Sequence, residues 1–217
     1  MKFSLFNFLY QYKTKNMDKK FEITSGKVVL SDPCYELGTW CQGTIDNVKN
    51  GTWIAQVEKT DGSDGWGVRC GALLSINEEA LKKDSSLMDV LTGNKSGNLE
   101  YLHFDGGVDS GQFGHFDYKH YRNDKSATDL EKYDFGDDYD REDGDVWYRA
   151  CAKITLDDEQ WGVLPHGVLS SSGYGDGSYP TYGVKDSDGQ YVGFVTIFIG
   201  EDESEDDDYD DYDEDED

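Results

Sequence analysis

Residues 181–199, TYGVKDSDGQYVGFVTIFI, predict the fold more directly than any other stretch of this sequence. Two β-prone runs flank Asp188-Gly189, a dipeptide that is typical of the tight turn of a β-hairpin. The run after the turn is the most apolar strand pattern in the chain. The stretch therefore predicts two antiparallel strands close to the end of the sequence.

Similar signals recur along the chain. Ser25-Gly26 predicts a hairpin or a bulge, and Asn50-Gly51 predicts another hairpin. Residues 146–156 alternate apolar with basic side chains, which predicts a strand. Asn77 is expected to cap a short helix over 78–91 that Asp84 would interrupt. The expected strands lie at 21–30, 44–60, 65–76, 99–107, 146–156 and 181–199. Seven or eight strands with one or two short helices make the fold mostly β, an antiparallel sandwich or curled sheet.

The acidic residues are distributed unevenly. Residues 201–217 hold 14 of the 46 acidic residues and no base, which leaves 32 acidic against 20 basic residues, a net charge of −12, on residues 1–200. Like charges at this density cannot be paired or buried, so we expect a disordered acidic tail at 201–217. Met17 begins a stretch typical of a domain start, so 1–16 is expected to be an extension without defined structure. We expect 17–200 to form one β-rich domain with a polar acidic insertion at about 118–145.

This charge balance limits the partners. An acidic body does not favour direct binding to a nucleic-acid backbone, which rewards a basic face, and instead favours a basic protein or cations. No apolar run approaches the ~20 residues of a membrane span. The cysteines at 34, 41, 70 and 151 lack the paired short spacings of a zinc site, so we expect reduced thiols and a cytoplasmic protein. The oligomeric state does not follow from the sequence.

A glycine-rich stretch, SSGYGDGSYPTYG at 171–183, is the first candidate site. It precedes a strand rather than a helix, which excludes a phosphate loop, and it contains no G-x-S-x-G elbow of a serine hydrolase. Its glycines allow positive φ angles, so the backbone would present polar side chains to a ligand. The alternative is a tight connection whose side chains bond to their own backbone. The candidate residues are Ser172, Asp176, Ser178 and Tyr179, with Tyr174 beside them.

A second candidate site lies in DGGVDSGQFGHFD at 105–117. Aspartate and histidine side chains bind metals or relay protons, but no H-x-x-x-H or H-E-x-x-H spacing is present. His115 between two phenylalanines also fits a partly buried strand residue. The acidic run 134–145 does not match an EF-hand and is expected to be a solvated loop. No cofactor is expected. Binding of a divalent cation is the alternative that these residues leave open. The candidate site residues of this stretch are Asp109, Ser110, His115 and Asp117. The candidate metal ligands, taken from both stretches, are Asp109, His115, Asp117 and Asp176.

These two stretches resemble a family of bacterial and phage proteins that is known only as a domain of unknown function. The resemblance rests on D-S-G…F-x-D at 109–117 and S-G-x-G-D-G-S-Y-P at 172–180, over roughly the C-terminal half of the chain. SDPCYELGTWC at 31–41 also resembles a segment of uncharacterised phage proteins. The family implies no activity. It does imply that the residues of its two motifs belong together, namely Asp109, Ser110, Gly111, Asp117, Gly173, Gly175, Asp176, Gly177 and Tyr179.

Three hypotheses for function follow. The first is a non-enzymatic binding protein that engages a basic protein, in the manner of an inhibitor that imitates nucleic-acid charge. The second is a small metal-dependent hydrolase or ligand-binding domain that uses Asp109, His115, Asp117 and Asp176. The third is architectural, with Asp109 and Asp176 capping backbone amides where strands change direction. No reaction follows from the residues, and the binding protein is the preferred hypothesis.

Overall fold

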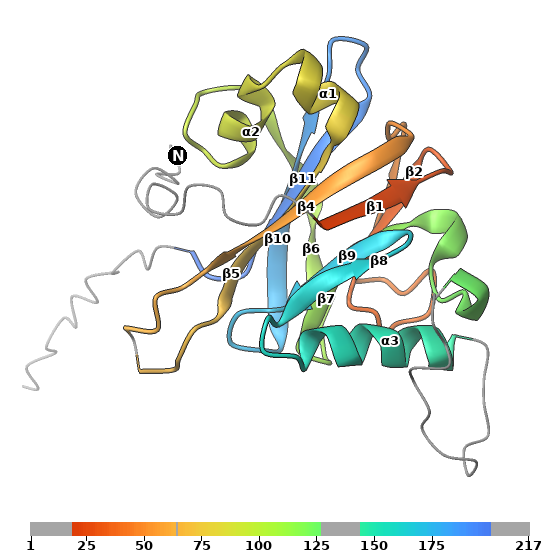
Figure 1. The fold of residues 1–217 in the computed structure, drawn as a ribbon, viewed down its shortest axis with the longest axis vertical. Coiled ribbons are helices and arrows are strands. Elements are labelled where there is room, and N and C mark those ends of the chain that lie inside the picture. Colours follow the sequence, from red (N-terminus) through yellow and green to blue (C-terminus); the bar gives the residue numbers. More distant parts are fainter. Residues whose placement is uncertain (1–18, 64, 127–143, 201–217) are drawn as a thin grey trace, which may run out of the picture.

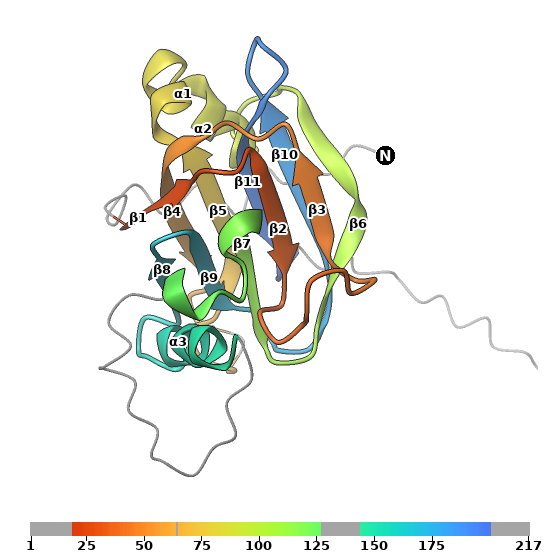
Figure 2. The same cartoon turned by 90° about the vertical axis from the view of Figure 1, so that its right-hand side faces the viewer.

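The structure is a computed structural model that describes residues 19–63, 65–126 and 144–200. Within these residues eleven strands form two antiparallel sheets that pack face to face, with three α-helices outside them (Figures 1 and 2). The predicted mostly β antiparallel sandwich is therefore confirmed. The expected extension at 1–16 and the expected tail at 201–217 lie outside the described residues, as does most of the polar insertion.

The larger sheet has the strand order β1-β4-β5-β11-β10-β6, and the smaller has the order β3-β2-β7-β9-β8. The strands of the larger sheet are β1 (Lys19–Ile23), β4 (Gly51–Lys59), β5 (Cys70–Asn77), β6 (Leu99–Val108), β10 (Gly177–Lys185) and β11 (Tyr191–Ile197). Those of the smaller sheet are β2 (Lys27–Ser31), β3 (Gly43–Asp46), β7 (Gln112–Asp117), β8 (Trp161–Leu164) and β9 (Gly167–Ser171).

The core between the sheets is aromatic and aliphatic. Trp53 of β4 stacks on Phe194 of β11, with ring centroids 5.7 Å apart, and Phe113 of β7 closes the core from the opposite sheet. All three side chains are fully buried. Phe194 belongs to the predicted C-terminal hairpin, whose strands β10 and β11 pair as expected around Asp188-Gly189.

The helices cover the outer faces of the sandwich at opposite ends (Figure 1). The helices α1 (Glu78–Lys83) and α2 (Ser86–Leu91) pack on the larger sheet, and α3 (Asp145–Thr155) packs on the smaller. Asn77 caps α1 as predicted by accepting a hydrogen bond from the Ala80 amide, and Asp84 separates α1 from α2. None of the described helices is long and apolar enough to cross a membrane.

The strand prediction for 146–156 is wrong, because this segment forms α3. Its buried residues are Trp147, Ala150, Cys151 and Thr155, a spacing of three and four that places them on one helical face. The apparent alternation combined Ala150 of the buried face with half-buried residues beside it, namely Val146, Tyr148, Ala152 and Ile154. Arg149 and Lys153, four residues apart, lie one turn from each other on the helix.

The two N-terminal hairpin predictions are also wrong. Strands β1 and β2 on either side of Ser25-Gly26 lie in different sheets, and so do β3 and β4 on either side of Asn50-Gly51. Both dipeptides are corners where the chain passes from one sheet to the other, joined by a 2.7 Å hydrogen bond from the Gly26 amide to Asn50 Oδ1. Three strands were not predicted, namely β7, β8 and β9, and the strand expected from residue 65 begins only at Cys70.

Candidate functional site

The two glycine-rich stretches meet at one end of the sandwich. Gly177 of β10 pairs with Val108 of β6, and the Ser172 amide donates a 3.0 Å hydrogen bond to the Gly111 carbonyl. The loop between β2 and β3 lies at the same end (Figure 2). We call this end, with the loops 32–42, 60–69, 109–111 and 172–176, the loop end.

A buried carboxylate, that of Asp32, fixes the turn at 109–111 to the start of the loop 32–42. Asp32 follows β2 and is fully buried. Its Oδ2 accepts hydrogen bonds from the amides of Asp109 (2.9 Å) and Ser110 (2.7 Å), and its Oδ1 accepts them from Ser110 Oγ (2.6 Å) and the Cys34 amide (2.8 Å). The Ser110 hydroxyl is therefore used inside the protein. Only one signal in the sequence points to Asp32, namely its position before Pro33 at the end of a strand.

The loop 172–176 is fixed by its own backbone and by Tyr179. The Gly175 amide donates to the Ser172 carbonyl (2.9 Å), and Ser172 Oγ donates to the Gly175 carbonyl (2.8 Å). The Tyr179 hydroxyl donates to the Gly175 carbonyl as well (2.8 Å). Gly173 has φ +58°, and a Cβ there would lie 3.0 Å from Phe198 Cβ. Ser172 and Tyr179 thus shape the loop, whereas Asp176 and Ser178 are exposed.

The exposed groups at the loop end are carboxylates and aromatic rings. Asp109 and Asp176 are exposed on neighbouring loops. Trp66 and Tyr174 contact each other edge to face, with centroids 6.4 Å apart, and are 68% and 56% exposed. Trp40, in the loop after β2, is 93% exposed. The loop end therefore combines negative charge with accessible aromatic surface.

The Cys34 thiol at the loop end is not suited to nucleophilic catalysis. Cys34 lies next to Asp32 and Ser110, where burial and the Asp32 carboxylate raise its pKa to about 12. A nucleophilic cysteine needs a lowered pKa, because the thiolate is the reactive form. A hollow of about 470 Å³ lies on α3, and its lining contains no residue of the two motifs: Arg149, Ala152, Lys153, Leu156 and Asp157.

His115 lies between the sheets. Its ring nitrogens are 2.9 Å from Ser75 Oγ and 2.9 Å from Thr196 Oγ1, both on the larger sheet, and the side chain is 1% exposed. Burial lowers its pKa to about 3, so the ring is neutral at physiological pH. The residue joins the two sheets and has no path to a ligand at the loop end.

Asp117 lies at the other end of β7 and is also fully buried. Its carboxylate accepts five hydrogen bonds, from the amide and hydroxyl of Thr24, the amide and hydroxyl of Ser25, and the Lys119 amide. Burial by itself would raise the pKa of Asp117, but the bonds from Ser25, Thr24 and Lys119 outweigh it and lower the pKa. Asp117 thus holds the corner between β1 and β2.

The four predicted metal ligands are not brought together. Asp109 and Asp117 lie at opposite ends of β7, which at about 3.3 Å per residue separates them by roughly 20 Å. His115 is enclosed between them in the core, and only Asp176 shares the loop end with Asp109. The buried carboxylates that cap backbone amides are Asp32 and Asp117, whereas the architectural hypothesis had expected Asp109 and Asp176.

A different group of metal-binding side chains was missed. Atoms of Asp117, His120 and His166 lie within 4.8 Å of one another. His166 Nδ1 donates to the Glu22 carbonyl (3.1 Å), which leaves Nε2 as an acceptor. However, the two rings stack in parallel with centroids 3.6 Å apart, whereas two imidazoles on one tetrahedral ion require about 5 Å. The Asp117 oxygens already accept hydrogen bonds from Thr24, Ser25 and Lys119. The two histidine rings would have to separate before both could bind one ion. The divalent cation stays a prediction.

Comparison with known proteins places the chain in a family. Searches of curated proteins and of solved structures found no match. One family model matches residues 21–196, from β1 to the last residues of β11, and so extends well beyond the C-terminal half on which the resemblance rested. The chain therefore belongs to the family described as "Protein of unknown function (DUF4241)".

Proposed function

We propose that this chain is a non-enzymatic binding protein whose loop end contacts a basic protein partner. The observation that carries the proposal is the position of Trp66, Tyr174 and the carboxylates of Asp109 and Asp176 on loops at one end of the sandwich. Aromatic side chains are enriched in protein interfaces and supply much of their binding energy. The carboxylates supply the charge that selects a basic surface.

The loops are held in place before any partner arrives. Asp32 fixes the turn at 109–111 through four hydrogen bonds, and Tyr179 fixes the loop at 172–176. A loop that is already ordered loses less conformational entropy on binding. The rigid connections at the loop end therefore favour recognition of a partner of fixed shape.

The charge of the whole chain acts over a longer range. The net charge is −26, of which the segment 201–217 contributes −14. A field of this sign speeds the encounter with a basic protein and repels nucleic acid, an effect that salt screens beyond about 10 Å. A chain that presents carboxylates in this number would compete with nucleic acid for the basic face of a protein. We place this encounter in the cytoplasm, where reduced thiols are expected.

The hydrolase alternative receives less support. It requires Asp109, His115, Asp117 and Asp176 to face one substrate, and two of these side chains are buried with all their polar atoms engaged. Of the four, only Asp109 and Asp176 are exposed at the loop end.

The test is the capture of proteins from a bacterial extract on the immobilised full chain, at about 50 and 500 mM salt. We expect the pair Asp109→Asn/Asp176→Asn, and separately Trp66→Ser/Tyr174→Ser, to lose a basic protein that the native chain retains at low salt. Asp89→Asn/Asp188→Asn removes the same charge at the far end and should retain it. Equal loss in both charge pairs, or a captured partner that is not basic, would refute the proposal.

A further inference from the structure

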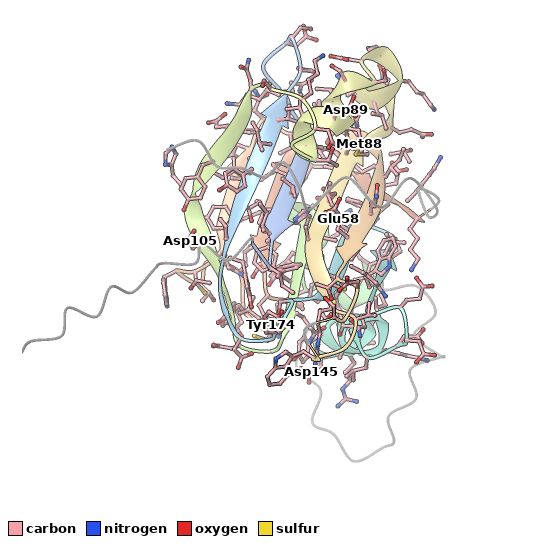
Figure 3. All side chains as sticks on the ribbon, turned by 90° about the vertical axis from the view of Figure 1, so that its left-hand side faces the viewer. Glu58, Met88, Asp89, Asp105, Asp145 and Tyr174 are labelled. Carbon is pink, nitrogen blue, oxygen red and sulfur yellow. The ribbon has the colours of Figure 1, made fainter. Side chains whose placement is uncertain are left out.

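The exposed hydrophobic side chains gather at the loop end. Figure 3 shows Tyr174 at one end of the molecule and Met88 and Asp89 of α2 at the other. Exposed hydrophobic residues that are scattered singly are normal, whereas a group of them among polar residues is typical of an interaction surface. Seven large hydrophobic side chains of the described residues are exposed, and five of these lie on the loops of the loop end, namely Leu37, Trp40, Trp66, Val68 and Tyr174.

Two of these side chains, Trp66 and Tyr174, form a corner between two loops. Their ring centroids are 6.4 Å apart, and the planes of the rings are inclined at 68° to each other. Both side chains are exposed, so a group can approach the corner from solvent. A cation is attracted to an aromatic ring when it lies within about 6 Å of the ring centroid. The separation of the two centroids therefore allows one small cationic group to contact both rings at once.

The loops that carry the two rings are fixed. The Thr60 amide donates a hydrogen bond to the Arg69 carbonyl (2.8 Å), and the Arg69 amide donates to Thr60 Oγ1 (2.9 Å), which closes the loop 60–69 at its base. Within this loop Arg69 Nε donates to the Trp66 carbonyl (3.0 Å). The loop 172–176 is held by Ser172 and Tyr179. The backbone under both rings therefore loses little entropy when a ligand binds.

The charge of the loop end suits a cation. Asp176 is exposed and follows Tyr174 by two residues, and Asp109 is exposed on the neighbouring loop. Burial and then the Asp176 charge raise the pKa of Tyr179, so the field of this carboxylate acts within the loop that carries Tyr174. Carboxylates and aromatic faces attract the same kind of ligand, because both present negative charge to it.

Among the basic side chains, arginine fits such a corner better than lysine. The guanidinium group is planar and weakly hydrated, so its face can lie on one ring while its edge directs N–H donors toward a carboxylate. The lysine ammonium is compact and strongly hydrated, and aromatic faces do not replace the water that it would lose. An aromatic corner beside carboxylates therefore selects arginine.

We propose that the corner between Trp66 and Tyr174 binds an arginine side chain of the basic partner, with Asp176 supplying the opposite charge. This inference rests on the proposed function, because it names the group by which the loop end recognises its partner. It goes beyond attraction by charge, which does not distinguish arginine from lysine.

A pair of short peptides tests the selectivity. Both consist of glycine and serine, and one carries arginine where the other carries lysine, at alternate positions. Their affinity for the full chain is measured by fluorescence anisotropy at about 50 mM salt, where screening is weak. We expect the arginine peptide to bind about three- to tenfold more tightly. The two affinities should become equal in Trp66→Ser and in Tyr174→Ser, whereas Tyr174→Phe, which keeps the ring, should retain the preference.

The matched control is Tyr118→Ser, which removes an exposed aromatic ring beside the opposite end of β7 and should leave the preference unchanged. Equal affinity of the native chain for the two peptides would overturn the arginine site and leave the basic partner of the proposed function intact. A preference that persists in Trp66→Ser/Tyr174→Ser, or no binding of either peptide, would overturn the arginine site as well. The capture experiment at two salt concentrations tests the basic partner separately.

The indole N–H signal of Trp66 in a proton–nitrogen NMR spectrum gives a second readout. This signal is assigned by its loss in Trp66→Ser, and N-acetylarginine amide is then added to the native chain. We expect the Trp66 signal to shift and the signal of the buried Trp53 to stay in place. N-acetyllysine amide at the same concentration should cause a smaller shift. A Trp66 signal that moves no more than that of Trp53, or equally with both amides, would refute the proposal.

Discussion

Replacing Asp32 by asparagine should destabilise the protein far more than replacing the neighbouring Asp109. The two side chains belong to the same loop end, but Asp32 is fully buried and accepts four hydrogen bonds, whereas Asp109 is exposed. Asparagine has nearly the same shape as aspartate, so Asp32→Asn changes the hydrogen bonds and the charge with little change in packing.

The magnitude follows from the donors around the carboxylate. If the new amide group takes the place of Oδ2, it faces the amides of Asp109 and Ser110. If it takes the place of Oδ1, it faces the amide of Cys34. Each buried donor that loses its acceptor costs about 1–3 kcal/mol, and the remaining bonds lose the extra strength that a charged acceptor gives. We therefore expect the free energy of unfolding to fall by about 2–4 kcal/mol.

Urea unfolding followed by tryptophan fluorescence measures this change, because Trp53 and Trp161 are buried in the core. Asp109→Asn is the matched control and should alter the free energy of unfolding by no more than about 0.5 kcal/mol. A loss below about 1 kcal/mol for Asp32→Asn would mean that the carboxylate does not hold the turn at 109–111. The architectural interpretation of the loop end would then fail.

Three further predictions concern single residues. The pKa of Asp117 lies below its ordinary 3.8, so its contribution to stability should be complete above about pH 4 and lost as the pH falls further. In urea unfolding between pH 2.5 and 6, the free energy of unfolding should depend less on pH in Asp117→Asn than in the native chain, and an equal dependence would contradict this. Gly173→Ala should lower the melting temperature more than Gly111→Ala, because both glycines have a left-handed φ (+58° and +68°) but a Cβ meets Phe198 at 3.0 Å only at position 173; equal shifts would show that the contact is unimportant. Cys34, with a pKa of about 12, should react with iodoacetamide at pH 8 roughly a thousandfold more slowly than in urea, and rapid labelling in the native protein would disprove the raised pKa.

The sequence predicted those parts of the fold in which local pattern and tertiary position agree. The hairpin at Asp188-Gly189 and the cap at Asn77 were correct, because a turn or a helix start there satisfies its own backbone locally. The hairpin predicted at Asn50-Gly51 was wrong, because the same dipeptide also occurs at a corner between two sheets. No local signal in the sequence shows which strands pair with each other. The helix at 145–155 was predicted as a strand, because basic residues four positions apart fit a repeat of two residues as well as a repeat of 3.6.

The candidate site shows a related limit. Glycines marked both loops correctly, yet the carboxylate that joins the first loop to β2 comes from Asp32, 77 residues earlier than Asp109. A contact of this separation has no signature in one sequence, and neither has the stack of His120 on His166. Exposure was equally invisible, because Tyr174 and Tyr179 lie in the same glycine-rich stretch, yet Tyr174 is exposed and Tyr179 is half-buried.

The two kinds of aspartate in this protein explain why the glycine-rich stretches can both build the fold and remain open to a partner. Asp32 and Asp117 are buried, and together they accept nine hydrogen bonds at the two ends of the strand region around β7. Because Asp32 satisfies the amides of the turn at 109–111, and Ser172 and Tyr179 hold the loop at 172–176, Asp109 and Asp176 are not needed for that purpose and stay exposed. An exposed carboxylate on a loop that other groups hold keeps a fixed position without being desolvated, which is the arrangement that recognition of a cationic side chain requires. Substitution of Asp109 or Asp176 should therefore change binding with little change in stability, and substitution of Asp32 should change both.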